Sequence, residues 1–175
     1  MSRASEVLTF KVLVAGLDNA GKTTFIKSIA EIDVISADPV SSTSDGVADF
    51  GRIMIDDNII LYLMSIPEKS PQLDSDVETY WSILKEDMLG LIILVDSTAP
   101  ELFKKVALKT IFFELNSPAP YLIVANKQEK IGAWDLDALR FALRVPSTVP
   151  IIPCVAHDRK SVTNVLITLL QTIQM

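Results

Sequence analysis

The chain has 175 residues, 49 % of them hydrophobic, which is enough to bury the core of one domain and too short for two ordinary ones. We therefore expect a single domain over residues 1–175. Sixteen Lys and Arg against 22 Asp and Glu give a formal net charge of −6, and this acidic balance argues against nucleic acid or an anionic membrane as the main partner. Any anion that the protein binds must be held by local structure.

The cysteine content and the two ends of the chain predict a cytoplasmic setting. Cys154 is the single cysteine, which excludes an internal disulfide, and the first residues form no apolar signal segment. The apolar runs are too short to cross a bilayer. Residue 2 is Ser rather than Gly, and the last residues include no prenylation cysteine. We expect no direct membrane anchor, so any membrane contact would come through a partner.

Along the chain, short apolar runs alternate with segments of helical period. This pattern is typical of an α/β protein of three layers, in which helices cover both faces of a mostly parallel sheet. The expected buried strands are 11–14, 59–64, 91–95, 121–125 and 151–155. A further strand, 50–55, is joined to 59–64 by the turn-forming residues Asp56, Asp57 and Asn58. That hairpin indicates one antiparallel edge strand.

Helices are predicted where a capping residue or an early proline precedes an apolar period. The segments that satisfy this are 102–115, which follows Pro100, and 136–143, which follows Asp135. The clearest apolar stripe lies in the last helix and consists of Val162, Val165, Leu166, Leu169, Leu170 and Ile173. Two polar segments, 31–49 and 65–76, have no period, and loops of that length in a small domain are usually functional.

Residues 16–24, GLDNAGKTT, follow an apolar run and lead into a helical segment. Their glycine and lysine spacing is typical of a loop whose backbone N–H groups surround a phosphate, where side chains would block the approach. Lys22 would reach the terminal phosphates, and the Thr23 hydroxyl would hold Mg²⁺. An ordinary strand-to-helix turn containing two glycines is the alternative interpretation. The loop residues expected to bind a nucleotide are Asp18, Asn19, Ala20, Gly21, Lys22, Thr23 and Thr24.

A second motif, Asn126-Lys127-Gln128-Glu129, follows the expected strand 121–125. In this position it resembles the guanine-reading Asn-Lys-x-Asp of small GTPases. A carboxylate that accepts from both the ring N–H and the exocyclic amine of guanine rejects adenine, which has no such donor pair. Glu129 is one methylene longer than Asp, which can weaken the preference. A polar loop after a strand is the alternative.

A third motif, Val155-Ala156-His157, follows the last expected strand, where the same family usually reads Ser-Ala-Lys. The Ala156 N–H would point at the guanine carbonyl, and His157 would pack on the base. Together with residues 90–97, GLIILVDS, these motifs resemble a Ras-superfamily small GTPase of the ADP-ribosylation-factor-like branch or the small prokaryotic GTPases allied to it. The resemblance covers nearly the whole chain. It implies a P-loop NTPase fold with a six-stranded sheet, about five helices, two switch loops, and GTP or GDP with Mg²⁺ as cofactors.

The second switch departs from the family pattern and is degenerate. In the family, the strand before it ends in Asp-x-x-Gly-Gln, where Asp steadies Mg²⁺, Gly contacts the third phosphate and Gln orients the attacking water. Aligning residues 61–68 on this pattern places Met64 at the Asp, Pro67 at the Gly and Glu68 at the Gln. A thioether is a poor ligand for a hard cation, and proline has no N–H to donate. Glu68 brings a negative charge where the family has a neutral amide.

The first switch also departs from the pattern. Counting back from Met64 places Asp45 where a metal-binding Thr is expected, and Thr43 or Ser44 would substitute only if the loop shifts. Asp45 could itself bind Mg²⁺ and partly offset the loss at Met64.

The sequence therefore predicts a guanine-nucleotide-binding protein with impaired hydrolysis and switching, which acts as a partner-binding regulatory module. The alternative is a GTPase completed in trans by a partner, with Glu68 as the candidate catalytic residue that accepts a proton from water. The resemblance to small prokaryotic GTPases suggests a roadblock-type partner. A small-metabolite kinase is a third interpretation, but it lacks an arginine-rich lid and leaves Asn126 to Glu129 unexplained.

Overall fold

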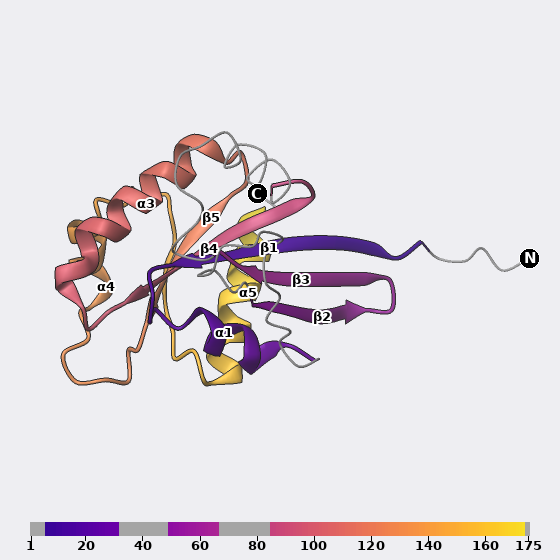
Figure 1. Ribbon diagram of the computed structural model, residues 1–175, viewed down its shortest axis with the longest axis horizontal. Helices are drawn as coiled ribbons and strands as arrows, with labels where there is room; N and C mark the ends of the chain where they lie inside the picture. The colour runs from indigo at the N-terminus through magenta and orange to yellow at the C-terminus, as the bar shows by residue number, and fades with distance from the viewer. Residues whose placement is uncertain (1–5, 32–48, 67–84, 174–175) are drawn as a thin grey trace, which may run out of the picture.

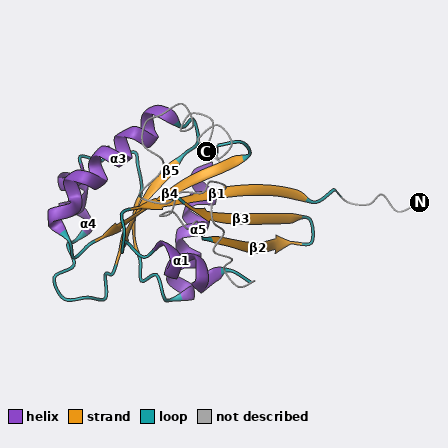
Figure 2. Ribbon diagram, in the orientation of Figure 1, coloured by secondary structure: helices purple, strands orange, loops and turns teal. Residues whose placement is uncertain are grey.

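A six-stranded sheet forms the centre of the molecule, with the strands in the order β2-β3-β1-β4-β5-β6 (Figures 1 and 2). The computed structural model describes residues 6–31, 49–66 and 85–173. Among the described strands, β2 is antiparallel to β3, and all other neighbours are parallel. The mostly parallel sheet with an antiparallel edge strand is therefore confirmed. The strands are β1 (Leu8–Gly16), β2 (Phe50–Asp56), β3 (Ile59–Ser65), β4 (Met88–Asp96), β5 (Tyr121–Asn126) and β6 (Ile151–Pro153).

Helices cover both faces of this sheet, as the alternation of apolar runs and helical segments predicted. Helices α1 and α5 lie on one face, and α3 and α4 lie on the other (Figure 1). About five helices were expected, and the described ranges contain four α-helices and one short 3₁₀ turn at Pro100–Leu102. The helices are α1 (Lys22–Ile29), α3 (Phe103–Asn116), α4 (Leu136–Leu143) and α5 (Arg159–Ile173).

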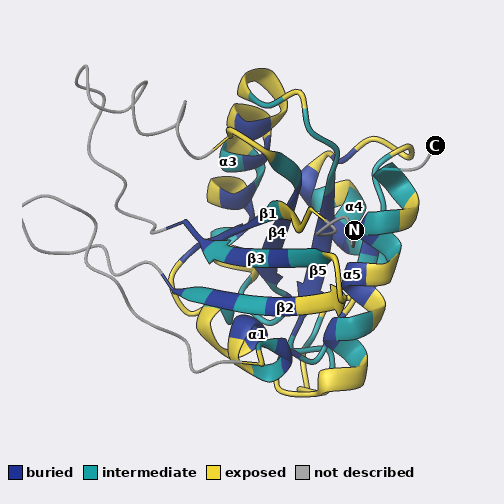
Figure 3. Ribbon diagram, turned by 90° about the vertical axis from the view of Figure 1, so that its right-hand side faces the viewer, coloured by how far each residue is buried: buried dark blue, intermediate teal, exposed yellow. Residues whose placement is uncertain are grey.

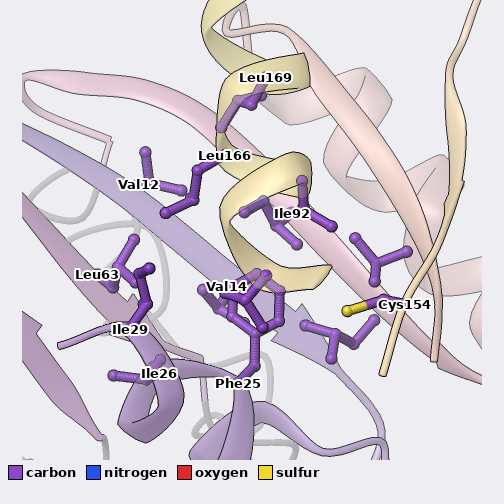
Figure 4. Close-up of a cluster of buried hydrophobic side chains, with 14 of the residues drawn as sticks. Val12, Val14, Phe25, Ile26, Ile29, Leu63, Ile92, Cys154, Leu166 and Leu169 are labelled. Carbon is purple, nitrogen blue, oxygen red and sulfur yellow. The ribbon is translucent and has the colours of Figure 1, made fainter. Parts of the chain in front are cut away.

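The sheet contributes side chains to two hydrophobic cores, because successive side chains of a strand point to opposite faces. In β1, Val12 and Val14 face α1 and α5, while Leu13 and Ala15 face α3 and α4. Figure 4 shows the first core, in which Phe25 of α1 packs among strand and α5 side chains. In Figure 3 the buried residues follow the strands and the inner sides of the helices. Burial on both faces explains why the strands read as continuous apolar runs.

The ends of several elements differ from the predicted ones. The last strand was expected to reach residue 155 but ends at Pro153, one residue before the Cys154 N–H, which still donates to Ala125 O of β5 at 2.8 Å. Helix α3 begins one residue later than predicted, after the 3₁₀ turn. Helix α4 has the predicted bounds, and the side chain of Asp135 caps it by accepting from the Ala138 N–H at 2.9 Å.

The parallel strands bring several loops to one edge of the sheet. The carboxyl ends of β1, β3, β4, β5 and β6 all lie there, and this is where open α/β sheets bind ligands. Because β2 is antiparallel, its amino end lies at the same edge, with Asp49 directly before it. Within the described ranges, no helix has the length and apolar character needed to cross a membrane.

Candidate nucleotide-binding site

The loop between β1 and α1 has the backbone shape that its glycines predict. Gly16, Asn19 and Gly21 all have positive φ values, of 151°, 62° and 103°. A Cβ atom at Gly16 would lie 2.7 Å from Leu94 O, and one at Gly21 would lie 2.4 Å from the Asn126 side-chain nitrogen. Both positions therefore require glycine, for conformation and for close approach.

The amino end of α1 is open toward this loop. The first intrahelical hydrogen bond runs from the Phe25 N–H to Gly21 O at 2.8 Å, so the amides before Phe25 point out of the helix end. The first turn of α1 contains no acidic residue that would offset the positive end of the helix dipole. Thr23 and Thr24 lie exposed on this turn. The arrangement suits an anion such as a phosphate.

The Lys22 side chain extends back over the loop that precedes it in the sequence. Its ammonium group donates to Gly16 O at 2.9 Å and to Leu17 O at 3.0 Å. These bonds hold the positive charge over the loop, where the sequence analysis expected the terminal phosphates. Asp18 and Asn19 lie exposed at the outer part of the loop. Ala20 is buried, and its carbonyl oxygen is part of the next contact.

Asn126, at the end of β5, ties the phosphate loop to the loop after β6. It is only 2 % exposed, its amide group donates to Ala20 O at 2.8 Å, and its carbonyl oxygen accepts from the Ala156 N–H at 2.9 Å. The contact of the Ala156 N–H with a guanine carbonyl stays a prediction. In the structure this N–H donates to Asn126, which supplies the acceptor that a buried N–H needs.

Lys127 and Asp96 form an ion pair across the carboxyl ends of β4 and β5, with Nζ and Oδ2 2.5 Å apart. Asp96 also accepts from the N–H and the hydroxyl of Thr98, at 2.9 and 2.6 Å. Burial acts to raise the pKa of Asp96, but the hydrogen bonds from Lys127 and Thr98 outweigh it and lower the pKa. The carboxylate is therefore charged at neutral pH and fixes the start of the Lys127 loop.

Gln128, the variable position of the second motif, shapes the rest of that loop. Its amide group donates to Ser97 Oγ at 2.8 Å and to Trp134 O at 3.0 Å, while the Trp134 N–H donates to Ser97 O at 2.9 Å. No role was predicted from the sequence for Gln128, Ser97 or Asp96. The signal that could have found them is their position, because polar residues that follow neighbouring parallel strands meet at one edge of the sheet.

Glu129 and His157 face each other from the loops after β5 and β6. Glu129 Oε1 lies 3.9 Å from His157 Nδ1, and the side chains are 34 % and 67 % exposed. The structure thus brings together the carboxylate expected to read guanine and the imidazole expected to pack on it. Both side chains are accessible from the solvent.

Thr23, the residue expected to hold Mg²⁺, donates its hydroxyl hydrogen to Oδ2 of Asp49. Asp49 is 7 % exposed. Mg²⁺ on a nucleotide takes most of its ligands from phosphate and water, so one hydroxyl and one nearby carboxylate suit it. The described ranges contain no group of three or more acidic, His or Cys side chains that could hold a metal without such help.

Met64, aligned with the metal-steadying acid, is partly buried and packs against the core beneath α3 and α4. It offers no oxygen ligand. The remaining switch residues singled out from the sequence, including the candidate catalytic residue, lie outside the described ranges. These are Thr43, Ser44, Asp45, Pro67 and Glu68.

No protein-family model matches the chain. It is similar to ADP-ribosylation factor-like protein 3 of Chlamydomonas reinhardtii, with 26 % identity over 140 residues that cover 78 % of this chain and 73 % of that protein. It is also similar to ADP-ribosylation factor-like protein 3 of Caenorhabditis elegans, with 31 % identity over 127 residues that cover 70 % and 63 % of the two chains.

Among solved structures, the fold is similar to that of the small GTPase Arl6 (BBS3) from Trypanosoma brucei, whose structure holds the nucleotide analogue GppNp. The TM-score is 0.66 at 18 % identity, over 95 % of this chain and 98 % of that one. The fold is that of a P-loop small GTPase. Within this class, the resemblance to the ADP-ribosylation-factor-like branch, which three sequence motifs predicted, is confirmed.

Proposed function

We propose that the protein binds guanine nucleotide at the loop between β1 and α1, hydrolyses GTP poorly by itself, and acts as a partner-binding regulatory module. One observation carries this proposal. The glycine turn before α1 suits the approach of a phosphate, whereas Met64, at the end of the neighbouring strand β3, is a thioether that faces away from α1 and gives the site no oxygen ligand.

Several groups of the described structure would contact the bound nucleotide. The amides at the start of α1 and the Lys22 ammonium would contact the phosphates. Glu129 would accept from the guanine edge, with His157 beside it. The Trypanosoma brucei Arl6 structure, of the same fold, holds a nucleotide analogue, which supports a nucleotide as the ligand. When bound, Mg²⁺ would neutralise phosphate charge, and the Thr23 hydroxyl would be its protein ligand.

Poor hydrolysis is expected because the chain lacks groups that the reaction needs. Removing a group that stabilises the developing charge or positions the water costs a factor of about 10² to 10³ in rate. At Met64 the described structure offers no such group. By sequence, Pro67 has no N–H for the third phosphate, and Glu68 brings a like charge toward it.

The regulatory role rests on a protein partner, and the resemblance to small prokaryotic GTPases suggests one of the roadblock type. Such a partner could also supply an arginine and a water-positioning group in trans. In that case Glu68 would be the residue that accepts a proton from water.

Titration calorimetry with GDP, GTP and ATP on the purified, nucleotide-free chain tests the binding proposal. We expect uptake of GDP and GTP and much weaker uptake of ATP. Replacing Lys22 with Ala should weaken the binding of both guanine nucleotides, whereas replacing Lys105, exposed on α3, should not. No uptake of GDP or GTP at millimolar concentration would contradict the proposal, and a preference for ATP would favour a kinase.

A further inference from the structure

Asp49 sits where the antiparallel strand β2 begins, at the edge of the sheet that carries the phosphate loop. Two hydrogen bonds with Ser65 hold the Asp49 backbone in place. The Asp49 N–H donates to Ser65 Oγ at 2.7 Å, and the Ser65 N–H donates to Asp49 O at 2.9 Å. Ser65 is 2 % exposed, so this pair extends the β2–β3 ladder into the protein by one step beyond Phe50 and Met64. The position of the Asp49 backbone is therefore set by the sheet.

The alternation of side chains along β2 points Asp49 toward α1. Ile53 belongs to the core beneath α1 and α5, and Gly51, two residues earlier, packs directly against α1. A Cβ atom at Gly51 would lie 2.6 Å from Ile26 Cγ2 and 2.9 Å from Ala30 Cβ. The absence of a side chain at Gly51 lets β2 approach α1 closely, and this brings the Asp49 carboxylate to Thr23.

The contact between Asp49 and Thr23 leaves the threonine oxygen able to bind a cation. A hydroxyl has one hydrogen to donate and two lone pairs. The hydrogen goes to Asp49 Oδ2, and Thr23 is exposed on its other side. A carboxylate that accepts this hydrogen increases the electron density on the hydroxyl oxygen and fixes its orientation, as the outer partners of metal ligands commonly do.

We infer that Asp49 is the carboxylate of the Mg²⁺ site in this protein: it holds the Thr23 hydroxyl in position for the ion, from the start of β2 rather than from the end of β3. The inference rests on the proposed nucleotide binding, because the phosphates would supply most of the ligands of the ion. Met64 cannot take this role, since its side chain is a thioether on the opposite face of the sheet. Asp49 is thus a positioning residue, and it was missed from the sequence, where Asp45 was the carboxylate expected to bind Mg²⁺.

The test measures how nucleotide affinity depends on Mg²⁺. The affinity of fluorescent GDP is measured over a range of Mg²⁺ concentrations and in EDTA, for the full chain and for Asp49→Asn. We expect the Mg²⁺ concentration at half-effect to rise by about 10- to 100-fold in the variant, the usual loss when an outer partner of a metal ligand is removed. The affinity measured in EDTA should stay unchanged. Asp57→Asn, in the exposed turn between β2 and β3, changes the net charge equally and should leave both values unchanged.

A double variant separates positioning from general stability. Thr23→Ala should raise the half-effect concentration on its own, and adding Asp49→Asn to it should raise that concentration little further, because the two residues act as a unit. Thr23→Ser, which keeps the hydroxyl, should restore the Mg²⁺ dependence. If Asp49→Asn lowers the melting temperature but leaves the Mg²⁺ dependence at the wild-type value, the contact is structural and the inference is wrong.

A measurement on the unmodified chain covers the case in which Asp49→Asn does not fold. Fe²⁺ replaces Mg²⁺ in the nucleotide complex, and ascorbate with peroxide then cleaves the backbone near the ion. Cleavage beside both Asp49 and Thr23 is expected, and cleavage beside Thr23 without Asp49 overturns the inference. If the wild-type chain binds no nucleotide, the proposed function fails and the inference fails with it. Binding that is equal with and without Mg²⁺ defeats the inference alone.

Discussion

Two neighbouring parallel strands, β1 and β3, end at the same edge of the sheet but carry different groups at their ends. After β1, two glycines, Lys22 and the open end of α1 form a turn with the geometry expected of a phosphate loop. At the end of β3, Met64 packs into the core, and the Ser65 hydroxyl is bound to the backbone of Asp49. Under the proposed function, nucleotide binding would depend on the end of β1 and hydrolysis on the end of β3, so that one could be kept while the other is lost.

The largest expected effect comes from the phosphate loop itself. Gly21→Ala places a Cβ 2.4 Å from the Asn126 side chain at a φ of 103°, so the loop must move or strain. We expect calorimetry to show that guanine-nucleotide affinity falls by about 100-fold or more, with a loss of stability of about 1–3 kcal/mol.

Gly132→Ala is the matched control, because Gly132 also has a positive φ, of 88°, but nothing lies within 4 Å of the added Cβ. It should cost about 1 kcal/mol and leave nucleotide affinity unchanged. Wild-type affinity in Gly21→Ala would show that the loop geometry does not hold the ligand.

The next largest effect is expected at Asn126, which joins the phosphate loop to the loop after β6. Asn126→Ala removes two hydrogen bonds and leaves the buried Ala20 carbonyl and Ala156 N–H without their partner. Each such group costs about 1–3 kcal/mol, so urea denaturation should show a loss of roughly 2–5 kcal/mol. Asn116→Ala, whose side chain makes an exposed bond to Phe112 O, should cost about 0.5 kcal/mol or less. Equal losses for the two would mean that Asn126 does not join the loops.

An acid placed at the end of β3 tests whether hydrolysis is lost because this strand end lacks a carboxylate. Met64→Asp puts a carboxylate against the apolar core, so we expect a stability loss of about 1–3 kcal/mol and no gain in GTP hydrolysis. Met54→Asp, on the exposed part of β2, should have little effect on either. A clear rise in single-turnover hydrolysis in Met64→Asp would show that β3 lacks only this acid.

The smallest effect is a pH dependence from Asp96. Its pKa in the folded protein is lowered, so it stabilises the fold above its unfolded pKa of about 3.9, and this contribution is lost as the pH falls through the folded value. The stability difference between the wild type and Asp96→Asn, measured by urea denaturation, should therefore shrink from pH 6 toward pH 3. A difference that stays constant over this range would contradict the ion pair with Lys127.

Cys154 lies in the protein interior. It is 1 % exposed, and burial, more than the nearby Asp158 and Glu129, raises the pKa of its thiol. A buried thiol with a raised pKa is expected to be unreactive.

The sequence predicted the sheet well, because strands buried on both faces read as unbroken apolar runs and the Asp56-Asp57-Asn58 turn marked the hairpin. It also predicted the turn between β1 and α1, whose local backbone depends on glycine spacing. It could not predict contacts between distant segments. The Asp49 contact with Thr23 depends on how closely β2 approaches α1, and the role of Gln128 depends on Ser97 and Trp134, which are distant in sequence. The contact of the Ala156 N–H with Asn126 also joins segments that are distant in sequence.

The most direct test of the account loads the protein with GTP in the presence of Mg²⁺, removes free nucleotide, and identifies the bound nucleotide over time by chromatography after denaturation. The account predicts that GTP stays bound and is converted to GDP more slowly than the rate on the order of 10⁻⁴ per second of an unassisted small GTPase. A protein that retains no guanine nucleotide, or one that accumulates GDP at that ordinary rate without a partner, would contradict it.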